Sequence, residues 1–170
     1  AKGIIAKFCI VSLTLPKNIS KKQVEELSKG VSNACKEFKI QLLGGDTNQG
    51  NEISIHVVLF GSVKKFIKRN GAKVGDIICT TGPFGYTLSA LEIIMNKRKS
   101  TKFFSIKSKN LFFKPKPRLK FGQESADYIT SSMDSSDGLS SCLNELSNQS
   151  KKKFLITKIP TNKDIIKFSE

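Results

Sequence analysis

The chain has 170 residues, of which 38% are hydrophobic, a length that fits one domain of ordinary size or two small lobes. No apolar run approaches the roughly 18 residues needed to cross a bilayer, so we expect a cytoplasmic protein with no membrane partner. The four cysteines are widely spaced and form no C-x-x-C pair, so we expect neither a zinc site nor a disulfide framework. The net charge of +15 comes mainly from dispersed lysines with only three arginines, so we expect any binding of nucleic acid to be non-specific.

The first 38 residues predict one strand and one amphipathic helix. Residues 4–15 are rich in β-branched and large apolar side chains and are followed by Pro16, as is typical of a strand. Ser20 suits the N-cap of a helix over residues 21–38, in which apolar side chains recur at helical spacing.

The rest of the chain alternates between strand and helix patterns and is interrupted at glycines. Gly44-Gly45 stops a short apolar strand, and residues 131–138 read as a polar loop. The other predicted elements are, in chain order, strands over 40–43, 52–63 and 77–80, helices over 86–96, 118–129 and 139–146, and a strand over 153–159. Because strands and helices alternate while several strands have short links, we expect an α/β fold with a mixed sheet. The turn-rich stretch 70–76 marks the best internal boundary.

The most basic stretch covers residues 96–120 and contains Phe103, Phe104, Phe112 and Phe113 among many lysines. Interleaved basic and aromatic side chains can bind single-stranded nucleic acid. A solvated, lysine-rich connection whose phenylalanines pack inward is the simpler interpretation, and it is the one that we prefer.

A glycine pair followed by a carboxylate, Gly44-Gly45-Asp46-Thr47, is the first motif that can carry chemistry. Glycines let backbone amides approach a phosphate closely. An aspartate at this point can hold a hard cation such as Mg²⁺, which bridges phosphate oxygens. A glycine turn with an exposed aspartate is the alternative, and the motif alone favours that alternative.

A second acidic motif, residues 134–139, leads into a predicted helix. Asp134 and Asp137 are three residues apart with hydroxyls between them, so they can converge on a metal and a phosphate. The helix start adds amide donors and a favourable dipole. The alternative is a plain N-cap, because Asp and Ser are favoured there.

A third motif places Arg69 just before the glycine-rich turn. Its fork of donors could clamp a phosphate, although a surface turn is the alternative. His56 is the only histidine and lies within an apolar strand, where a satisfied histidine of the core or the sheet face is more plausible than a catalytic base. We identify no general base, so the catalytic residues stay unknown.

In this order, the three motifs resemble those of thiamine-monophosphate kinase, a family in the superfamily named after aminoimidazole ribonucleotide synthetase. The resemblance extends over nearly the whole chain and corresponds to the central portion of the family's sequence. Each motif alone is common, but the ordered set is specific. The matching segments are Gly44-Gly45-Asp46-Thr47, Arg69 with residues 71–76, Pro117-Arg118, and residues 134–139.

The resemblance implies a two-lobed mixed-sheet fold, represented here in part. Residues 1–70 would belong to a sheet-rich lobe through which members of the family form homodimers, and residues 71–170 to a C-terminal α/β lobe. The implied reaction is transfer of the γ-phosphoryl group of ATP to thiamine monophosphate, with Mg²⁺ neutralising charge. The residues that would hold Mg²⁺ are Asp46, Asp134 and Asp137. The residues that would contact ATP are Gly45, Asp46, Arg69 and Ser136.

The sequence also departs from the family pattern. The family's preceding segment, which carries further metal-binding aspartates and part of the thiamine site, has no counterpart here, so we expect an incomplete enzyme. Many members have Asp after the glycine that corresponds to Gly85, whereas this chain has Tyr86. Two other functions stay open: another ATP-dependent synthetase of the superfamily, and a non-catalytic basic module that binds nucleic acid.

Overall fold

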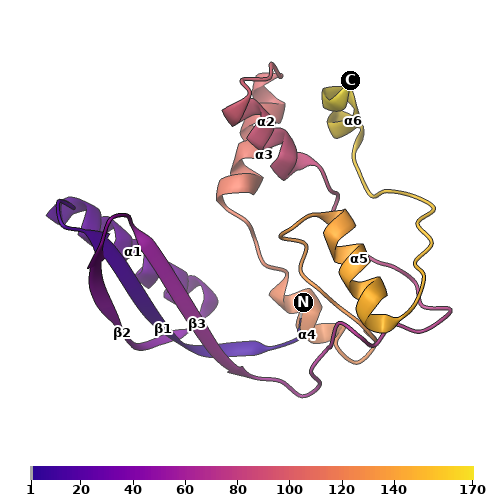
Figure 1. Ribbon diagram of the computed structural model, residues 1–170, viewed down its shortest axis with the longest axis horizontal. Coiled ribbons are helices and arrows are strands. Elements are labelled where there is room, and N and C mark those ends of the chain that lie inside the picture. Colours follow the sequence, from indigo (N-terminus) through magenta and orange to yellow (C-terminus); the bar gives the residue numbers. More distant parts are fainter. Residues whose placement is uncertain (1) are drawn as a thin grey trace. The chain divides into compact units, whose positions relative to one another are not determined.

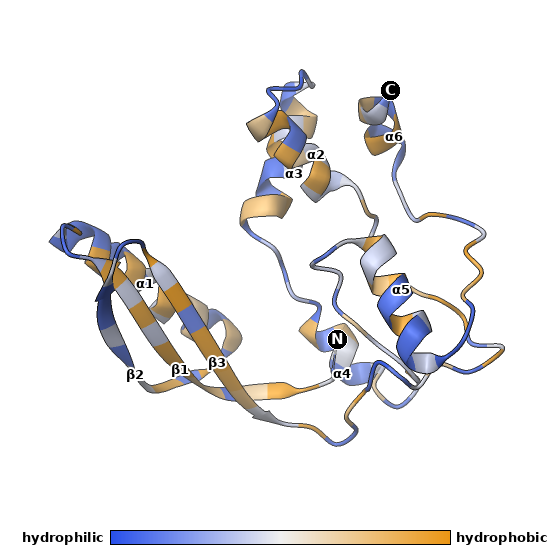
Figure 2. Ribbon diagram, viewed as in Figure 1, coloured by the Kyte–Doolittle hydropathy of each residue, from blue (hydrophilic) through white to orange (hydrophobic). Residues whose placement is uncertain are grey.

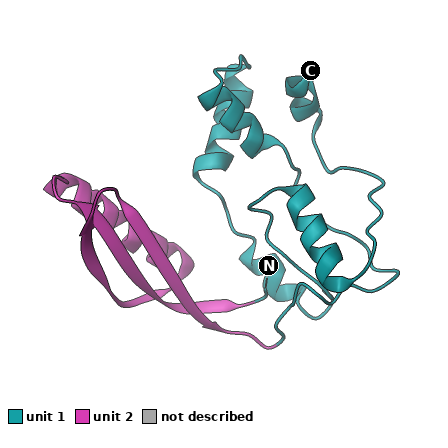
Figure 3. Ribbon diagram, in the orientation of Figure 1, with its two compact units in different colours: residues 1–3, 65–170 teal, residues 4–64 magenta. Residues whose placement is uncertain are grey.

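The computed structural model describes residues 2–170 of the chain. Contacts between residues divide it into two compact units, which are coloured separately in Figure 3. The sheet unit comprises Ile4–Lys64, and the helical unit comprises Lys65–Glu170 together with Lys2 and Gly3. Among these described residues, no helix is both long and apolar enough to cross a membrane.

The sheet unit is a three-stranded mixed sheet with one helix along one face (Figure 1). Its elements are β1 (Ile5–Pro16), α1 (Lys21–Phe38), β2 (Gln41–Gly50) and β3 (Ser54–Ser62). The central strand is β1, which pairs in parallel with β2 and antiparallel with β3. This mixed sheet confirms the predicted α/β class, and β1 and β3 confirm the first and third predicted strands.

Local capping signals explain why α1 begins and ends as the sequence predicts. The Ser20 hydroxyl accepts a hydrogen bond from the backbone N–H of Gln23 at 3.2 Å. The side-chain oxygen of Gln23 in turn accepts one from the backbone N–H of Ser20 at 3.0 Å. This reciprocal pair is a capping box. At the other end, Lys39 adopts a left-handed conformation with φ of 54°. The helix is therefore specified by residues at its own ends.

The side chains of β1 alternate between the two faces of the sheet. Cys9, Val11 and Leu15 are buried on the face that α1 covers. Ser12 lies on the opposite face, in register with His56 of β3. Figure 2 shows that β1 and β3 are largely hydrophobic, whereas much of β2 is hydrophilic.

The strand β2 corrects the prediction that Gly44-Gly45 stops a strand. The strand continues through both glycines, with Gly45 opposite Val11 of β1. A Cβ atom on Gly45 would lie 1.7 Å from the Val11 carbonyl oxygen. Glycine is needed here because the two backbones approach closely, and not because the chain turns.

The helical unit contains five helices and irregular connections. They are α2 (Tyr86–Met95), α3 (Lys102–Phe113), α4 (Leu119–Glu124), α5 (Leu139–Ser150) and α6 (Lys163–Ser169). The predicted helices at 86–96 and 139–146 are confirmed, with α5 one turn longer, whereas the helix predicted over 118–129 shrinks to α4.

Two helices of this unit were not predicted, and two predicted strands do not form. The unpredicted helices are α3 and α6, so the basic stretch 96–120 is partly helical. The strands expected over 77–80 and 153–159 are irregular in the structure, and no described strand pairs with them. Apolar side chains in these segments are exposed, among them Ile77 and Leu155. Without a neighbouring strand, such segments have no ladder in which to satisfy their backbone groups.

An aromatic core joins α2, α3 and α6. It consists of Tyr86, Phe104 and Ile165, against which Phe168 packs. The rings of Phe104 and Phe168 stack with centroids 4.9 Å apart. Gly85, just before α2, has φ of 121°, and a Cβ atom there would lie 2.5 Å from Ile165 Cγ2. Both the backbone conformation and the close packing of α6 require glycine at this position.

Tyr86, the departure from the family pattern, anchors a polar cluster beside this core. Its hydroxyl donates to the Asp164 carboxylate at 2.9 Å and accepts a hydrogen bond from the Asn162 amide at 2.9 Å. The Lys107 ammonium contacts the same hydroxyl and forms an ion pair with Asp164 at 3.0 Å. The cluster satisfies a buried hydroxyl and fixes α6 on α2 and α3.

Candidate functional site

Asp46 projects from the middle of β2 into solvent. Its carboxylate accepts hydrogen bonds from the Ser12 hydroxyl and, at 2.7 Å, from the Asn48 amide, and these bonds hold the pKa of Asp46 below its ordinary value. An exposed carboxylate with such a pKa is ionised at neutral pH, and beyond these two hydrogen bonds it retains lone pairs for a cation. The sequence predicted Asp46 as a ligand but did not predict Ser12 or Asn48. The strand register brings them to its face of the sheet, since Ser12 pairs with Asp46.

His56 lies on the same face of the sheet, one strand beyond Ser12. It is exposed, and its Nε2 is 3.0 Å from the Ser54 hydroxyl. This placement confirms the interpretation of His56 as a sheet-face histidine.

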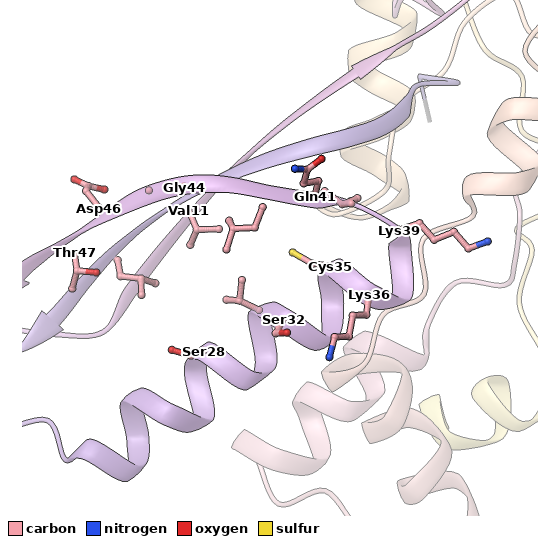
Figure 4. A pocket seen from close by; sticks show the side chains of 15 residues that line it. Val11, Ser28, Ser32, Cys35, Lys36, Lys39, Gln41, Gly44, Asp46 and Thr47 are labelled. Atoms are coloured by element: carbon pink, nitrogen blue, oxygen red, sulfur yellow. The ribbon is translucent and has the colours of Figure 1, made fainter.

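A cavity of about 820 Å³ lies between α1 and the strands β1 and β2 (Figure 4). The Gly44-Gly45-Asp46-Thr47 segment forms part of its wall. Figure 4 shows the Thr47 side chain directed toward α1 and the Asp46 carboxylate directed away from it. The cavity and the ionised carboxylate therefore face opposite sides of the sheet, and the cavity is not the pocket of Asp46.

In the helical unit, hydrogen bonds tie the segment that carries Arg69 to Ser131, Ser132 and Ser150. The Arg69 carbonyl accepts bonds from the Ser131 hydroxyl at 2.7 Å and the Ser150 hydroxyl at 3.1 Å. The Ser132 amide donates to the Lys68 carbonyl at 3.1 Å. These bonds bring the third motif next to the loop that begins the second acidic motif, a contact that bridges more than sixty residues of sequence.

The acidic loop before α5 is organised around Asp134. The Ser136 hydroxyl donates to its carboxylate at 3.0 Å, and the Cys142 thiol donates to its backbone carbonyl at 3.0 Å. The bond from Ser136, together with the positive charge of Arg69, lowers the pKa of Asp134. Asp134, Ser136 and Asp137 are all exposed. The loop therefore presents an ionised carboxylate, a hydroxyl and a second carboxylate to solvent.

The N-terminus of α5 corrects the plain N-cap interpretation of this motif. The N-cap residue is Gly138, with φ of 90°, and no side chain caps the helix. Neither Asp134 nor Asp137 is used as a cap, so the amides of the first turn have no side-chain partner. Free amides and the helix dipole favour an anion at this position.

Two residues beside Arg69 were not predicted from the sequence. Arg69 Nη1 lies 3.6 Å from Glu145 Oε1 of α5. The Lys2 ammonium donates to the Ser132 carbonyl at 2.7 Å. Burial and the charge of Arg69 lower the pKa of Lys2, while Asp134 opposes this shift. Both are brought here by tertiary contacts, and neither belongs to a recognisable motif.

The predicted site residues thus fall into two groups. Arg69, Asp134, Ser136 and Asp137 lie in the helical unit, and Gly45 and Asp46 lie in the sheet unit. Within the described residues, no group of three or more His, Cys, Asp or Glu side chains could hold a metal ion by itself. Taken unit by unit, the residues fit Mg²⁺, because the sheet unit offers one carboxylate and the helical unit two, and Mg²⁺ is usually bound by one or two carboxylates together with waters and substrate phosphates.

Comparison with known proteins reveals relatives along the whole chain. Residues 1–63 match the family model "AIR synthase related protein, N-terminal domain". A thiamine-monophosphate kinase of Nitrosopumilus maritimus is 49% identical over 170 residues, which are 100% of this chain and 55% of that protein. The chain spans about half the length of the curated relatives that it matches.

Solved structures of thiamine-monophosphate kinases share the fold of this chain. The structure of AaThiL complexed with AMPPCP and TMP has a TM-score of 0.82 at 30% sequence identity, covering 89% of this chain and 49% of that one. The crystal structure of thiamine monophosphate kinase from Aquifex aeolicus has a TM-score of 0.81, again at 30% identity, covering 88% of this chain and 51% of that one. These similarities confirm the fold that the sequence motifs implied.

Proposed function

We propose that the protein containing this chain, which is a relative of the thiamine-monophosphate kinases along all 170 residues, phosphorylates thiamine monophosphate to thiamine diphosphate with ATP. The observation that carries the proposal is the 49% identity to a thiamine-monophosphate kinase over the full chain. The complex of AaThiL with AMPPCP and TMP supports the same pair of substrates.

We assign the helical unit a role in binding the phosphates of ATP. Arg69 lies within the electrostatic reach of Asp134, and its guanidinium is only partly engaged, at 3.6 Å from Glu145. It can therefore turn its donors toward a phosphate oxygen. The uncapped amides at the start of α5 add neutral donors in the same unit. The Ser136 hydroxyl, which donates to Asp134 in this structure, would have to turn toward a phosphate oxygen to contribute another.

The aspartates of each unit would be ligands of Mg²⁺. Asp46 and Asp134 both have lowered pKa values, so each is an anionic ligand at neutral pH. Asp137 is the third candidate ligand. When bound, Mg²⁺ neutralises the charge of the triphosphate and stabilises the charge that develops on the transferred phosphoryl group.

Catalysis by this protein would depend on positioning and electrostatics. Phosphoryl transfer has a loose transition state in most analyses, which requires little from a general base. Neither the sequence nor the described residues point to one, because the only histidine, His56, is hydrogen-bonded to Ser54. The acceptor phosphate of thiamine monophosphate is itself anionic at neutral pH and can attack directly.

The proposal is tested by incubating the complete protein with ATP, Mg²⁺ and thiamine monophosphate and separating the products by chromatography. We expect thiamine diphosphate and ADP in equal amounts. Thiamine offered in place of its monophosphate provides the control acceptor, and it should give no product. ADP formation that does not depend on thiamine monophosphate would overturn the proposal and favour another reaction of the superfamily.

We propose that the protein acts in the cytoplasm, consistent with free cysteines at all four positions. We also propose a homodimer, as the resemblance implies. Light scattering at several concentrations measures the mass in solution, and a monomer at all concentrations would exclude the dimer.

A further inference from the structure

Two cysteines meet between α1 and the central strand of the sheet unit. The Sγ atoms of Cys9 on β1 and Cys35 on α1 are 3.7 Å apart, and both thiols are free. They would need to approach by about 1.7 Å to reach the disulfide bond length of about 2.0 Å. No residue of α1 is fully buried, and a cavity of about 820 Å³ separates the helix from the sheet, so the helix has room for this small movement.

The two thiols differ in access. Cys9 is 2% exposed, and burial raises the pKa of its thiol. Cys35 is half-buried and lines the cavity between α1 and the sheet, where Figure 4 shows its sulfur directed toward the strands. Lys36 and Lys39 line the same cavity, so an anionic reagent is attracted to it. A reagent therefore reaches Cys35 first.

We propose that Cys9 and Cys35 form a dithiol modification site, which a small anionic disulfide such as oxidised glutathione converts to an internal disulfide. The Cys35 thiolate attacks one sulfur of the reagent and expels one glutathione thiolate. The expelled thiolate takes the proton of the Cys9 thiol, and Cys9 Sγ then attacks Cys35 Sγ and expels the second glutathione. The two protein thiols lose two electrons and two protons, and the reagent is reduced to two thiols.

The location of this bond suggests what it would change. It would connect the C-terminal part of α1 to β1 at the point where the register between β1 and β2 shifts, between Cys9 and Ile10. At that point β1 pairs with Leu42 and then Gly44. A disulfide here would restrain a helix that otherwise covers the sheet with half-buried side chains only.

Peptide mapping of the complete protein after treatment with oxidised glutathione tests the site. Trypsin releases Cys9 in peptide 8–17 and Cys35 in peptide 30–36, and we expect these two peptides to be linked. Dithiothreitol should separate them. Hydrogen exchange of the backbone over residues 21–38 should be slower in the oxidised protein than in the reduced protein.

Two serine variants distinguish this pair of cysteines from the other cysteines of the chain. Cys35→Ser should abolish the link and the slower exchange, and Cys79→Ser, which alters an exposed cysteine outside the pair, should abolish neither. Glutathione that stays attached to Cys35 without a link to Cys9, or linkage of Cys9 to a different cysteine, would overturn the proposal. So would an oxidised protein in which exchange over residues 21–38 is unchanged.

Discussion

The guanidinium of Arg69 and the carboxylate of Glu145 face each other at 3.6 Å, each with 39% of its side chain exposed. This distance is within the range of an ion pair but too long for a strong hydrogen bond. A partly exposed pair of this kind contributes little to stability. Arg69 is therefore held near the acidic loop without being fully committed to a protein partner.

We expect Arg69→Ala to weaken ATP binding by about 1–3 kcal/mol, the usual loss for a charge-assisted hydrogen bond. The fold should persist, because the bonds from Ser131 and Ser150 go to the Arg69 carbonyl and survive the substitution. Calorimetry with Mg²⁺ present measures the affinity. Arg98→Ala is the control, since Arg98 stacks on Phe168 outside the site. Equal affinities of the Arg69 variant and the wild type would remove Arg69 from the site.

Asp46→Asn should remove most of the dependence of ATP affinity on Mg²⁺. The substitution keeps the shape of the side chain but removes the charge that a hard cation requires. Calorimetry with and without Mg²⁺ measures the difference, and circular dichroism checks the fold. Glu52→Gln, an exposed change in the same unit, should retain the full dependence. If both variants respond to Mg²⁺ like the wild type, Asp46 is not a ligand.

Two glycine substitutions in the sheet unit should have opposite effects on the free energy of unfolding. Gly45→Ala should destabilise by about 1–3 kcal/mol, as overpacking does, because the new Cβ atom would lie 1.7 Å from the Val11 carbonyl oxygen. Gly30→Ala should stabilise by about 0.5–1 kcal/mol, since Gly30 lies within α1 and a Cβ atom there would meet no atom within 4 Å. Denaturant titration measures both values. Equal stability of the two variants would contradict the close approach of β1 and β2.

Tyr86→Phe should destabilise the protein by about 1 kcal/mol, the net value of a typical hydrogen bond. The substitution removes the hydroxyl that contacts Asp164, Asn162 and Lys107. Tyr128→Phe is the matched control, because Tyr128 is 88% exposed, and it should have no effect. Thermal unfolding of the two variants side by side measures the difference. A Tyr86 variant as stable as the control would show that the cluster does not anchor α6.

The Asp164 carboxylate should make stability depend on pH. Burial opposes ionisation of Asp164, but the bonds from Lys107 and Tyr86 outweigh it and lower its pKa in the folded protein. The resulting stabilisation is present above the unfolded pKa of about 3.9 and is lost as the pH falls through the lower folded value.

Comparison of the wild type with Asp164→Asn between pH 3 and pH 7 measures this contribution. The difference in free energy of unfolding should be constant near neutral pH and should shrink toward pH 3. Asp127→Asn, an exposed change, is the control for general charge effects. A difference that grows as the pH falls would contradict the direction of the shift.

Elements whose ends are fixed by local hydrogen bonds could be predicted from the sequence. Ser20 and Gln23 cap α1 locally, so its bounds could be read directly. The signal for α3 was also local, because the Thr101 hydroxyl caps the Phe104 amide, but the dense lysines hid the helical period. The passage of β2 through Gly45 could not be predicted, since its cause is the backbone of Val11 in another strand.

The candidate site shows the same limit. Arg69 and Asp134 were both predicted from the order of the motifs. In the structure, the positive charge of Arg69 helps to lower the pKa of Asp134. Lys2, Ser12 and Glu145 could not be named, because each reaches its motif only through tertiary contacts. Sequence motifs therefore identify Ser136, which lowers the pKa of Asp134 from within the same motif, but not Ser12, which lowers the pKa of Asp46 from another strand.

The fate of the γ-phosphoryl group tests the proposed kinase reaction most directly. The complete protein is incubated with ATP labelled at the γ-phosphorus, Mg²⁺ and thiamine monophosphate, and the label is followed by chromatography. We expect the label to appear in thiamine diphosphate, one label for each ADP formed, and we expect Asp46→Asn to reduce this transfer strongly. Label that accumulates as inorganic phosphate, with no labelled thiamine diphosphate, would contradict the proposed reaction.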